Sequence, residues 1–218
     1  MKKFLTMVAA VCMFASCDAR DIEKSVNYDV EAFSAIDMIG VGEIIYKQGD
    51  TFSVKAEGDS IHLDNVTVKV TDGELVISQK KDLKNNEGIN FYITAPTLKK
   101  VTCAGVGTLK MLEAVSFDND FCLYQEGVGS VKIEDLTCKD FDFHQEGVGA
   151  ADIKVNCKNA KTVREGVGAA TLVIEADTLV LSSEGVGAIK VSGHVKDYQK
   201  KKSSIISAIQ DKNLVVGK

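Results

Sequence analysis

Proline and tryptophan are almost missing from this sequence of 218 residues, which contains one proline, Pro96, and no tryptophan. Glycine, in contrast, occurs 18 times. A chain rich in glycine and nearly free of proline is not a polyproline segment, so we expect its glycines to serve turns that need a positive φ. Hydrophobic residues make up 45% and charged residues 26%, which is the balance of a globular domain rather than of a disordered chain.

The sequence also lacks a basic face. Its formal net charge is −5, and Lys200-Lys201-Lys202 is the only basic run, which we interpret as a solvated loop. Domains that bind nucleic acid carry clustered lysine and arginine. We therefore exclude nucleic acid as a partner.

The first residues are apolar but too few to span a bilayer. Lys2 and Lys3 precede an apolar stretch over residues 4–15, which is typical of a signal peptide. The stretch ends in Phe14-Ala15-Ser16-Cys17, which resembles a bacterial lipobox, although leucine is usual where Phe14 stands. We predict a signal peptide over 1–16, lipidation at Cys17 and a polar tether over 17–27. The alternative is an ordinary secretory signal with an incidental cysteine.

Lipidation would fix the location of the mature protein. It would be exported and held by its lipid anchor on the outer membrane, with the membrane itself as one partner. Residues 1–16 contain two lysines and no acids, so the mature chain would carry a formal charge of −7. The sequence does not decide between the periplasmic side and the cell surface.

A Gly-Val-Gly tripeptide recurs along the second half of the chain. Its five copies lie 22, 20, 19 and 19 residues apart, and an earlier copy at Gly40 lies 65 residues before Gly105, which leaves room for about three coils. A fixed period near 20 residues indicates a solenoid with one repeat per coil. We expect the glycines to form corners and the valine between them to pack rather than to bind. The corner glycines are Gly105, Gly107, Gly127, Gly129, Gly147, Gly149, Gly166, Gly168, Gly185 and Gly187.

Aligning the copies on their first glycine gives four mainly apolar columns, at positions six and four before it and four and six after it. Residues two apart on a strand share a face, so each coil carries two short strands with an inward side. One coil cannot bury that side alone, but coils stacked about 4.8 Å apart can. The sequence therefore predicts an all-β, parallel β-helix-like solenoid. A β-sandwich or barrel is the alternative, and it does not explain the fixed columns.

The segments that flank the regular coils are expected to close the solenoid. Within residues 28–97, Asp72-Gly73 separates two alternating runs and predicts a hairpin. We expect 28–97 to form less regular strands that cap one end, 98–196 to form the coils, and 197–218 to cap the other end. Residues 28–218 would then be a single domain.

The repeat lacks the pattern of a dinucleotide site but carries a row of acids. A dinucleotide site needs a third glycine and a following helix, and both are missing, so we exclude nucleotides. A glutamate precedes the last four copies, and a row of carboxylates about 5 Å apart favours either a solvated edge or an edge that binds a cation such as Ca²⁺, or another ligand. No other cofactor is expected. These residues are Glu126, Glu146, Glu165 and Glu184.

Aligned acids also leave a catalytic alternative open. Asp120 and Asp140 share one column and Asp142 lies two residues further, an arrangement that could perform acid–base work on a polysaccharide. Asn159 and Thr178 continue the column, as a solvated face would, and nothing else resembles an enzyme. We therefore predict no catalysis and no metal centre.

Four cysteines lie beyond Cys17, with no pair at the spacing of a zinc site. They are Cys103, Cys122, Cys138 and Cys157. Cys138 and Cys157 share a column and should stack as inward thiols on adjacent coils, where side-by-side Cβ vectors suit a disulfide poorly.

Several short motifs resemble the auto-transporter adhesin head domain, or GIN domain, which is common in lipoproteins of Bacteroidetes. The resemblance covers about residues 28–218 and implies a right-handed β-helix-like fold, a role in adhesion and no catalytic residues. Members usually show Ser-Gly-Ser-Gly where this chain has Glu-Gly-Val-Gly, so the resemblance implies no ligand. The motifs are Phe33-Ser34-Ala35-Ile36, Gly40-Val41-Gly42, Lys47-Gln48-Gly49-Asp50, Gly73-Glu74-Leu75-Val76-Ile77 and Ala95-Pro96-Thr97-Leu98, besides the regular coils.

These observations predict a non-catalytic lipoprotein of the cell envelope. We expect it to present a rigid solenoid face to a glycan, another envelope protein or a host surface. The alternatives are a β-helix enzyme that cleaves polysaccharides and a purely structural envelope component.

Overall fold

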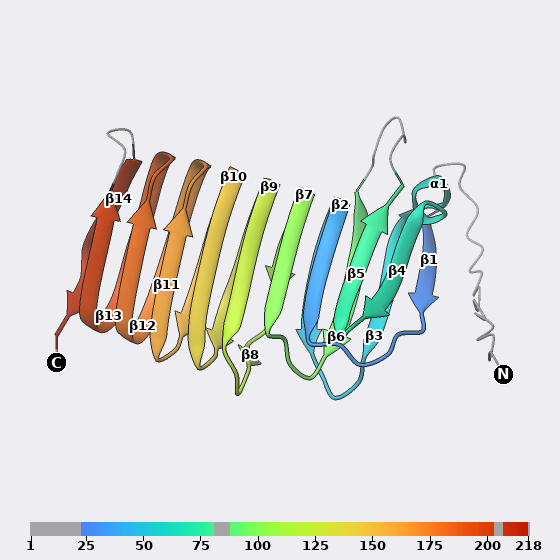
Figure 1. The fold of residues 1–218 in the computed structure, drawn as a ribbon, viewed down its shortest axis with the longest axis horizontal. Coiled ribbons are helices and arrows are strands. Elements are labelled where there is room, and N and C mark those ends of the chain that lie inside the picture. The colour runs from blue at the N-terminus through green and yellow to red at the C-terminus, as the bar shows by residue number, and fades with distance from the viewer. Residues whose placement is uncertain (1–22, 81–87, 203–206, 218) are drawn as a thin grey trace.

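The computed structural model describes residues 23–80, 88–202 and 207–217, and these form one continuous β-structure with a single short helix (Figure 1). Cys17, the signal peptide and most of the tether lie outside the described residues. The elements are β1 (Glu23–Tyr28), β2 (Ala35–Gln48), β3 (Ser53–Asp59), α1 (Ser60–Leu63), β4 (Val66–Thr71), β5 (Glu74–Gln79), β6 (Ile89–Ala95), β7 (Lys100–Met111), β8 (Val115–Ser116), β9 (Phe121–Thr137), β10 (Asp140–Asn156), β11 (Asn159–Arg164), β12 (Val167–Ser183), β13 (Val186–Lys202) and β14 (Ser207–Val216).

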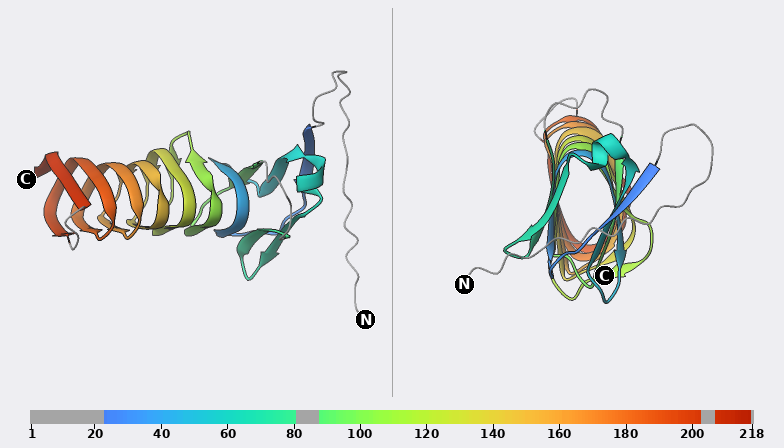
Figure 2. Two further views of the ribbon diagram at one scale, coloured as in Figure 1. Left: turned by 90° about the horizontal axis from the view of Figure 1, so that it is seen from above. Right: turned by 90° about the vertical axis from the view of Figure 1, so that its right-hand side faces the viewer.

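The coils stack in parallel and in register. Each strand pairs with the next in the order β2, β7, β9, β10, β11, β12, β13 and β14. Val128 is paired with Val106 on one side and with Val148 on the other, so equivalent residues of successive repeats form straight rows. Seen along the long axis, the coils overlie one another around a common interior (Figure 2). The predicted β-solenoid is confirmed.

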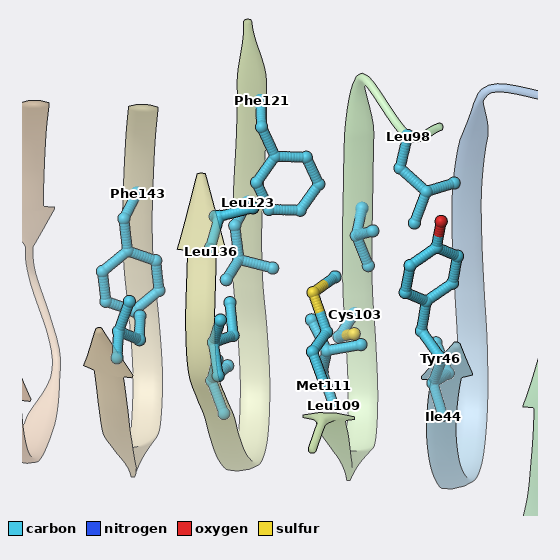
Figure 3. Packing of buried hydrophobic residues seen from close by; sticks show 14 of the residues in the cluster. Ile44, Tyr46, Leu98, Cys103, Leu109, Met111, Phe121, Leu123, Leu136 and Phe143 are labelled. Atoms are coloured by element: carbon cyan, nitrogen blue, oxygen red, sulfur yellow. The ribbon is translucent and has the colours of Figure 1, made fainter. Parts of the chain in front are cut away.

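The apolar columns fill this interior. Every residue of the four predicted columns, from Val101 to Val191, is at most 4% exposed. Phe121 and Phe141 stack with ring centroids 6.3 Å apart, and their neighbours Leu123 and Phe143 point the same way from β9 and β10 (Figure 3). Period-two alternation on both strands of each coil therefore produces one continuous core.

The segment between the first two Gly-Val-Gly copies does not form intervening coils. Strand β2 pairs directly with β7, and Gly40 lies opposite Gly105, so the expectation of about three coils between them is wrong. The chain instead folds to the far side of β2, where β5 and β6 pair with its two halves like one interrupted coil. Strands β3 and β1 then continue the sheet in antiparallel fashion.

The hairpin at Asp72-Gly73 is confirmed. Strands β4 and β5 are antiparallel, and the two turn residues have φ values of 53° and 77°. Two consecutive positive φ angles are what a two-residue hairpin turn of type I′ requires.

Polar side chains cover the core at the C-terminal end. Two inward columns end in Tyr198 and Lys200, which lie in register with Leu179 and Leu181 of the coil before. Asp211 of β14 accepts hydrogen bonds from the Tyr198 hydroxyl over 3.1 Å and from Lys200 Nζ over 2.6 Å. The bond from Lys200 lowers the pKa of Asp211.

Candidate functional site

The four repeat glutamates form one row along the outside of the coils. Glu126 and Glu146 are register partners. The backbone N–H of Glu165 donates to Gln145 O over 2.9 Å, and that of Glu184 donates to Arg164 O over 2.8 Å, which keeps the last two in line. All four residues are exposed, and we call them the Glu row. Among the described residues, the one basic side chain that pairs with the row is Lys201, with its Nζ 3.9 Å from Glu184.

The corner glycines are required by the contact between coils. A Cβ on Gly129 would overlap the carbonyl oxygen of Gly107, and one on Gly147 would overlap that of Gly127. The same backbone oxygen from the previous coil blocks every glycine of the regular copies. Two strips of backbone without side chains therefore run along the solenoid, one on each side of the valines.

The repeat valines point into solvent, so the expectation that they pack is wrong. Each is between 41% and 52% exposed, whereas the core columns are almost fully buried. The inward columns lie an even number of residues from the first glycine, so period-two alternation directs the valine, one residue beyond that glycine, to the outside. We call these residues the Val row and, together with the Glu row, the Glu–Val edge. The Val row consists of Val106, Val128, Val148, Val167 and Val186.

A buried polar row lies directly beneath this edge. The residue two before the first glycine points inward in each coil, and in four successive coils it is Gln125, Gln145, Arg164 and Ser183. Gln145 Nε2 donates to Gln125 Oε1 over 2.9 Å, and Arg164 Nη2 donates to Val186 O over 2.6 Å. Arg164 is only 1% exposed, and burial lowers its pKa.

Alternation in the sequence also places this row inside. Positions six and four before the glycine were assigned to the interior, and period-two alternation places position two before the glycine there as well. Its polar side chains obscured the pattern, because buried polar groups are uncommon in a core.

The structure does not assemble a metal centre from the Glu row. The described part of the chain contains no group of three or more His, Cys, Asp or Glu side chains placed to hold a metal ion. Calcium takes six to eight oxygen ligands, whereas the Glu row offers one carboxylate per coil on an open edge. The geometry gives no specific support to calcium there.

The three aspartates of the catalytic alternative do meet in one groove. This Asp groove, of about 310 Å³, lies across the outer face of β9 to β12 and is also lined by Asn159, Lys161 and Thr178. Asn159 Nδ2 donates to Asp140 Oδ1 over 2.8 Å. Asp142 lies 2.9 Å from His144 Nε2 and 3.7 Å from Lys161 Nζ. Two of the three carboxylates thus already have partners within the face.

The cysteines are free thiols in the described structure. Cys103, Cys138 and Cys157 are buried and Cys122 is half-buried, so the inward thiols expected at Cys138 and Cys157 are confirmed. Burial raises the pKa of Cys103 to about 12. Cys103, Cys138 and Cys157 belong to the core, whereas Cys122 lines the Asp groove.

Residues 32–217 match the family described as "Putative auto-transporter adhesin, head GIN domain". The chain belongs to this family. Its GIN domain is also similar to solved structures. A "putative adhesin" from Bacteroides fragilis NCTC 9343 shares 26% identity at a TM-score of 0.70, covering 89% of this chain and 95% of that one. A "putative adhesin" from Parabacteroides distasonis ATCC 8503 has the same TM-score at 14% identity, covering 87% and 97%.

A third structure extends the fold likeness to a protein with another description. It is a "putative lipid binding protein" from Parabacteroides distasonis ATCC 8503, with a TM-score of 0.52 and 15% identity over 90% of this chain and 97% of that one. No curated protein matches the chain. The family and these neighbours are described by adhesion or binding and not by catalysis. None of the helices in the described part of the chain is long and apolar enough to cross a membrane.

Proposed function

We propose that the chain is a non-catalytic lipoprotein of the cell envelope, anchored at Cys17, that binds a partner through the Glu–Val edge of its GIN domain. The observation that carries this proposal is the row of five valines, each about half exposed, beside a row of four glutamates. Exposed apolar side chains gathered in one place mark interaction surfaces, whereas scattered ones need no explanation.

The solenoid makes this surface rigid. Each corner is held by backbone pairing to the coils on both sides, and the buried columns prevent neighbouring coils from sliding. A preformed surface loses little conformational entropy on binding, which favours affinity. The adhesin descriptions of the family and of similar structures agree with a binding role. The partner class expected from the sequence is a glycan, an envelope protein or a host surface protein.

The proposal is tested on intact cells. Protease should remove the GIN domain from whole cells, and the Cys17→Ala variant should leave the membrane fraction while remaining exported. Adhesion of cells should fall when the gene is deleted and return with the wild-type chain. A domain that stays protected in intact cells would contradict a role in adhesion, since its edge would then face the periplasm.

A second candidate is supported by the Asp groove. Three aspartates on adjacent coils beside a lysine resemble the residue types that a polysaccharide-cleaving enzyme uses. The partners of Asp140 and Asp142 favour a structural role for these carboxylates instead. A screen of acidic polysaccharides for shortened products decides between them, with Asp142→Asn as the control. Product formation by wild-type protein that is lost in this variant would establish the enzyme.

A further inference from the structure

The spacing and charge of the Glu–Val edge suggest one shape of partner. Successive coils of a β-solenoid lie about 4.8 Å apart, so the five valines extend over about 19 Å. The pitch of an α-helix is 5.4 Å, whereas side chains on one face of an extended strand repeat at about 6.8 Å. A helix laid along the edge would therefore offer nearly one side chain per coil. The side chains of an extended strand would soon be out of register with the coils.

The relief of the edge fits a helix as well. The valines form a narrow ridge, because the glycines on both sides carry no side chain and the next outward side chains lie two residues away, about 6.8 Å along the strand. Helices pack by placing ridges into the grooves between their rows of side chains. The glycine strips leave room for the side chains that border such a groove.

Among the outward residues directly beside the valines, only one flank is charged. The Glu row runs along one side of the valines, and the residues two beyond the valines on the other side are small and uncharged. These residues are Thr108, Ser130, Ala150, Ala169 and Ala188. A fitting helix would therefore carry lysine or arginine along one flank of its apolar stripe and small or polar residues along the other.

The carboxylates of the Glu row repel one another. Carboxylates about 5 Å apart repel by about 1 kcal/mol per pair in water. Within the described residues only Glu184 has a basic neighbour, at 3.9 Å. Basic side chains from a partner would relieve this repulsion, and the same row would repel an anionic lipid surface.

We propose that the Glu–Val edge docks a basic amphipathic α-helix of a partner polypeptide, about 13 residues long where it contacts the five coils. The inference rests on the proposed function, because it names the partner of the same edge. It adds that the bound segment is helical, cationic and aligned with the solenoid axis.

The probe is a synthetic 15-residue peptide with a leucine stripe, lysines along one flank and glutamine elsewhere, compared with a scrambled peptide of the same composition. Binding is measured by titration calorimetry at 150 mM salt, and helix formation by circular dichroism. One variant neutralises the Glu row by Glu→Gln at all four positions. A second variant is Val128→Thr, Val148→Thr and Val167→Thr, which keeps shape and charge but removes apolar surface.

A matched control removes four carboxylates from elsewhere on the exposed surface. It combines Asp50→Asn, Asp118→Asn, Glu175→Gln and Asp197→Asn, all exposed and without ion pairs among the described residues. We expect the peptide to gain helix on binding wild-type protein and to bind at least about tenfold more weakly to the Glu-row variant. The valine variant should lose about fivefold, and the control should stay within about twofold of wild type.

Three results would overturn the inference. The first is an equal loss of affinity in the Glu-row variant and the control. The second is equal binding of the scrambled peptide. The third is that the peptide gains no helix with wild-type protein, whether or not it binds. If cell adhesion still depends on the edge while the peptide fails, the helical partner is wrong and the proposed function stands. If the edge variants also adhere like wild type, both fail.

Discussion

Gln79 pairs with the backbone N–H and C=O of Val41 through two hydrogen bonds. The Val41 N–H donates to Gln79 Oε1 over 2.9 Å, and Gln79 Nε2 donates to the Val41 carbonyl oxygen over 2.7 Å. In later coils the backbone of the preceding coil fills this place. One side-chain amide thus substitutes for a missing coil where the Gly-Val-Gly rows begin.

Removing that amide should destabilise the fold. Gln79→Met keeps the volume but leaves the donor and acceptor of Val41 without partners, at a cost of about 1 to 3 kcal/mol in the free energy of unfolding. Urea unfolding measures the loss. Gln199→Met is the matched control, because Gln199 is exposed, and it should change stability by less than about 0.5 kcal/mol. Equal effects of the two changes would show that Gln79 does not cap the row.

A methyl group on a corner glycine should separate two coils. Gly129→Ala places a Cβ against the carbonyl oxygen of Gly107, so we expect a loss of at least about 2 kcal/mol. At Gly88 no atom lies within 4 Å of an added Cβ, and Gly88→Ala should be nearly neutral. Thermal unfolding of the two variants checks the difference. A neutral Gly129→Ala would mean that the corners are loosely stacked.

The buried arginine should lower stability rather than raise it. Arg164 is 1% exposed, has no carboxylate partner among the described residues, and donates to one carbonyl oxygen. Desolvation of an unpaired charge is costly, so Arg164→Met should raise the free energy of unfolding by about 1 kcal/mol or more. Lys158→Met, at an exposed position, is the control. A clear loss of stability in Arg164→Met would instead indicate that a bound anion or ordered water compensates the charge.

The stability that the C-terminal cap gives to the fold should depend on pH. The pKa of Asp211 is lowered in the folded protein, so its ionised form stabilises the fold above the unfolded pKa, and this contribution is lost as the pH falls through the folded value. Asp211→Asn should therefore cost about 0.5 to 1 kcal/mol at pH 7 and progressively less as the pH falls below about 4. Denaturant unfolding at several pH values checks this. A loss that stays constant down to pH 2 would assign the effect to packing rather than to charge.

The core could be predicted from the sequence because its residues are of the apolar types that are usually buried. The columns through Leu109, Phe143 and Ile153 are apolar at a fixed spacing, and only a stacked fold places such columns in register. The hairpin followed from Asp72-Gly73 for an equally local reason, since both residues tolerate a positive φ.

The edge could not be predicted in the same way. Period-two alternation from the apolar columns directs Val148 outward, but valine is usually a core residue, so its residue type points the other way. Arg164 and Gln145 belong to polar residue types that are usually exposed, yet both are buried. The position of β2 beside β7 depends on contacts between residues 65 apart, which no local pattern encodes.

The most direct test of the account is site-specific photo-crosslinking in living cells of the native host. A photoreactive amino acid replaces Val148 on the Glu–Val edge or Lys158, which is exposed on the same coil away from that edge. If the Glu–Val edge docks a partner helix, a discrete polypeptide adduct forms at position 148 and disappears when the Glu row is neutralised, and none forms at position 158. Adducts of equal strength at both positions, or an adduct only at 158, would contradict it.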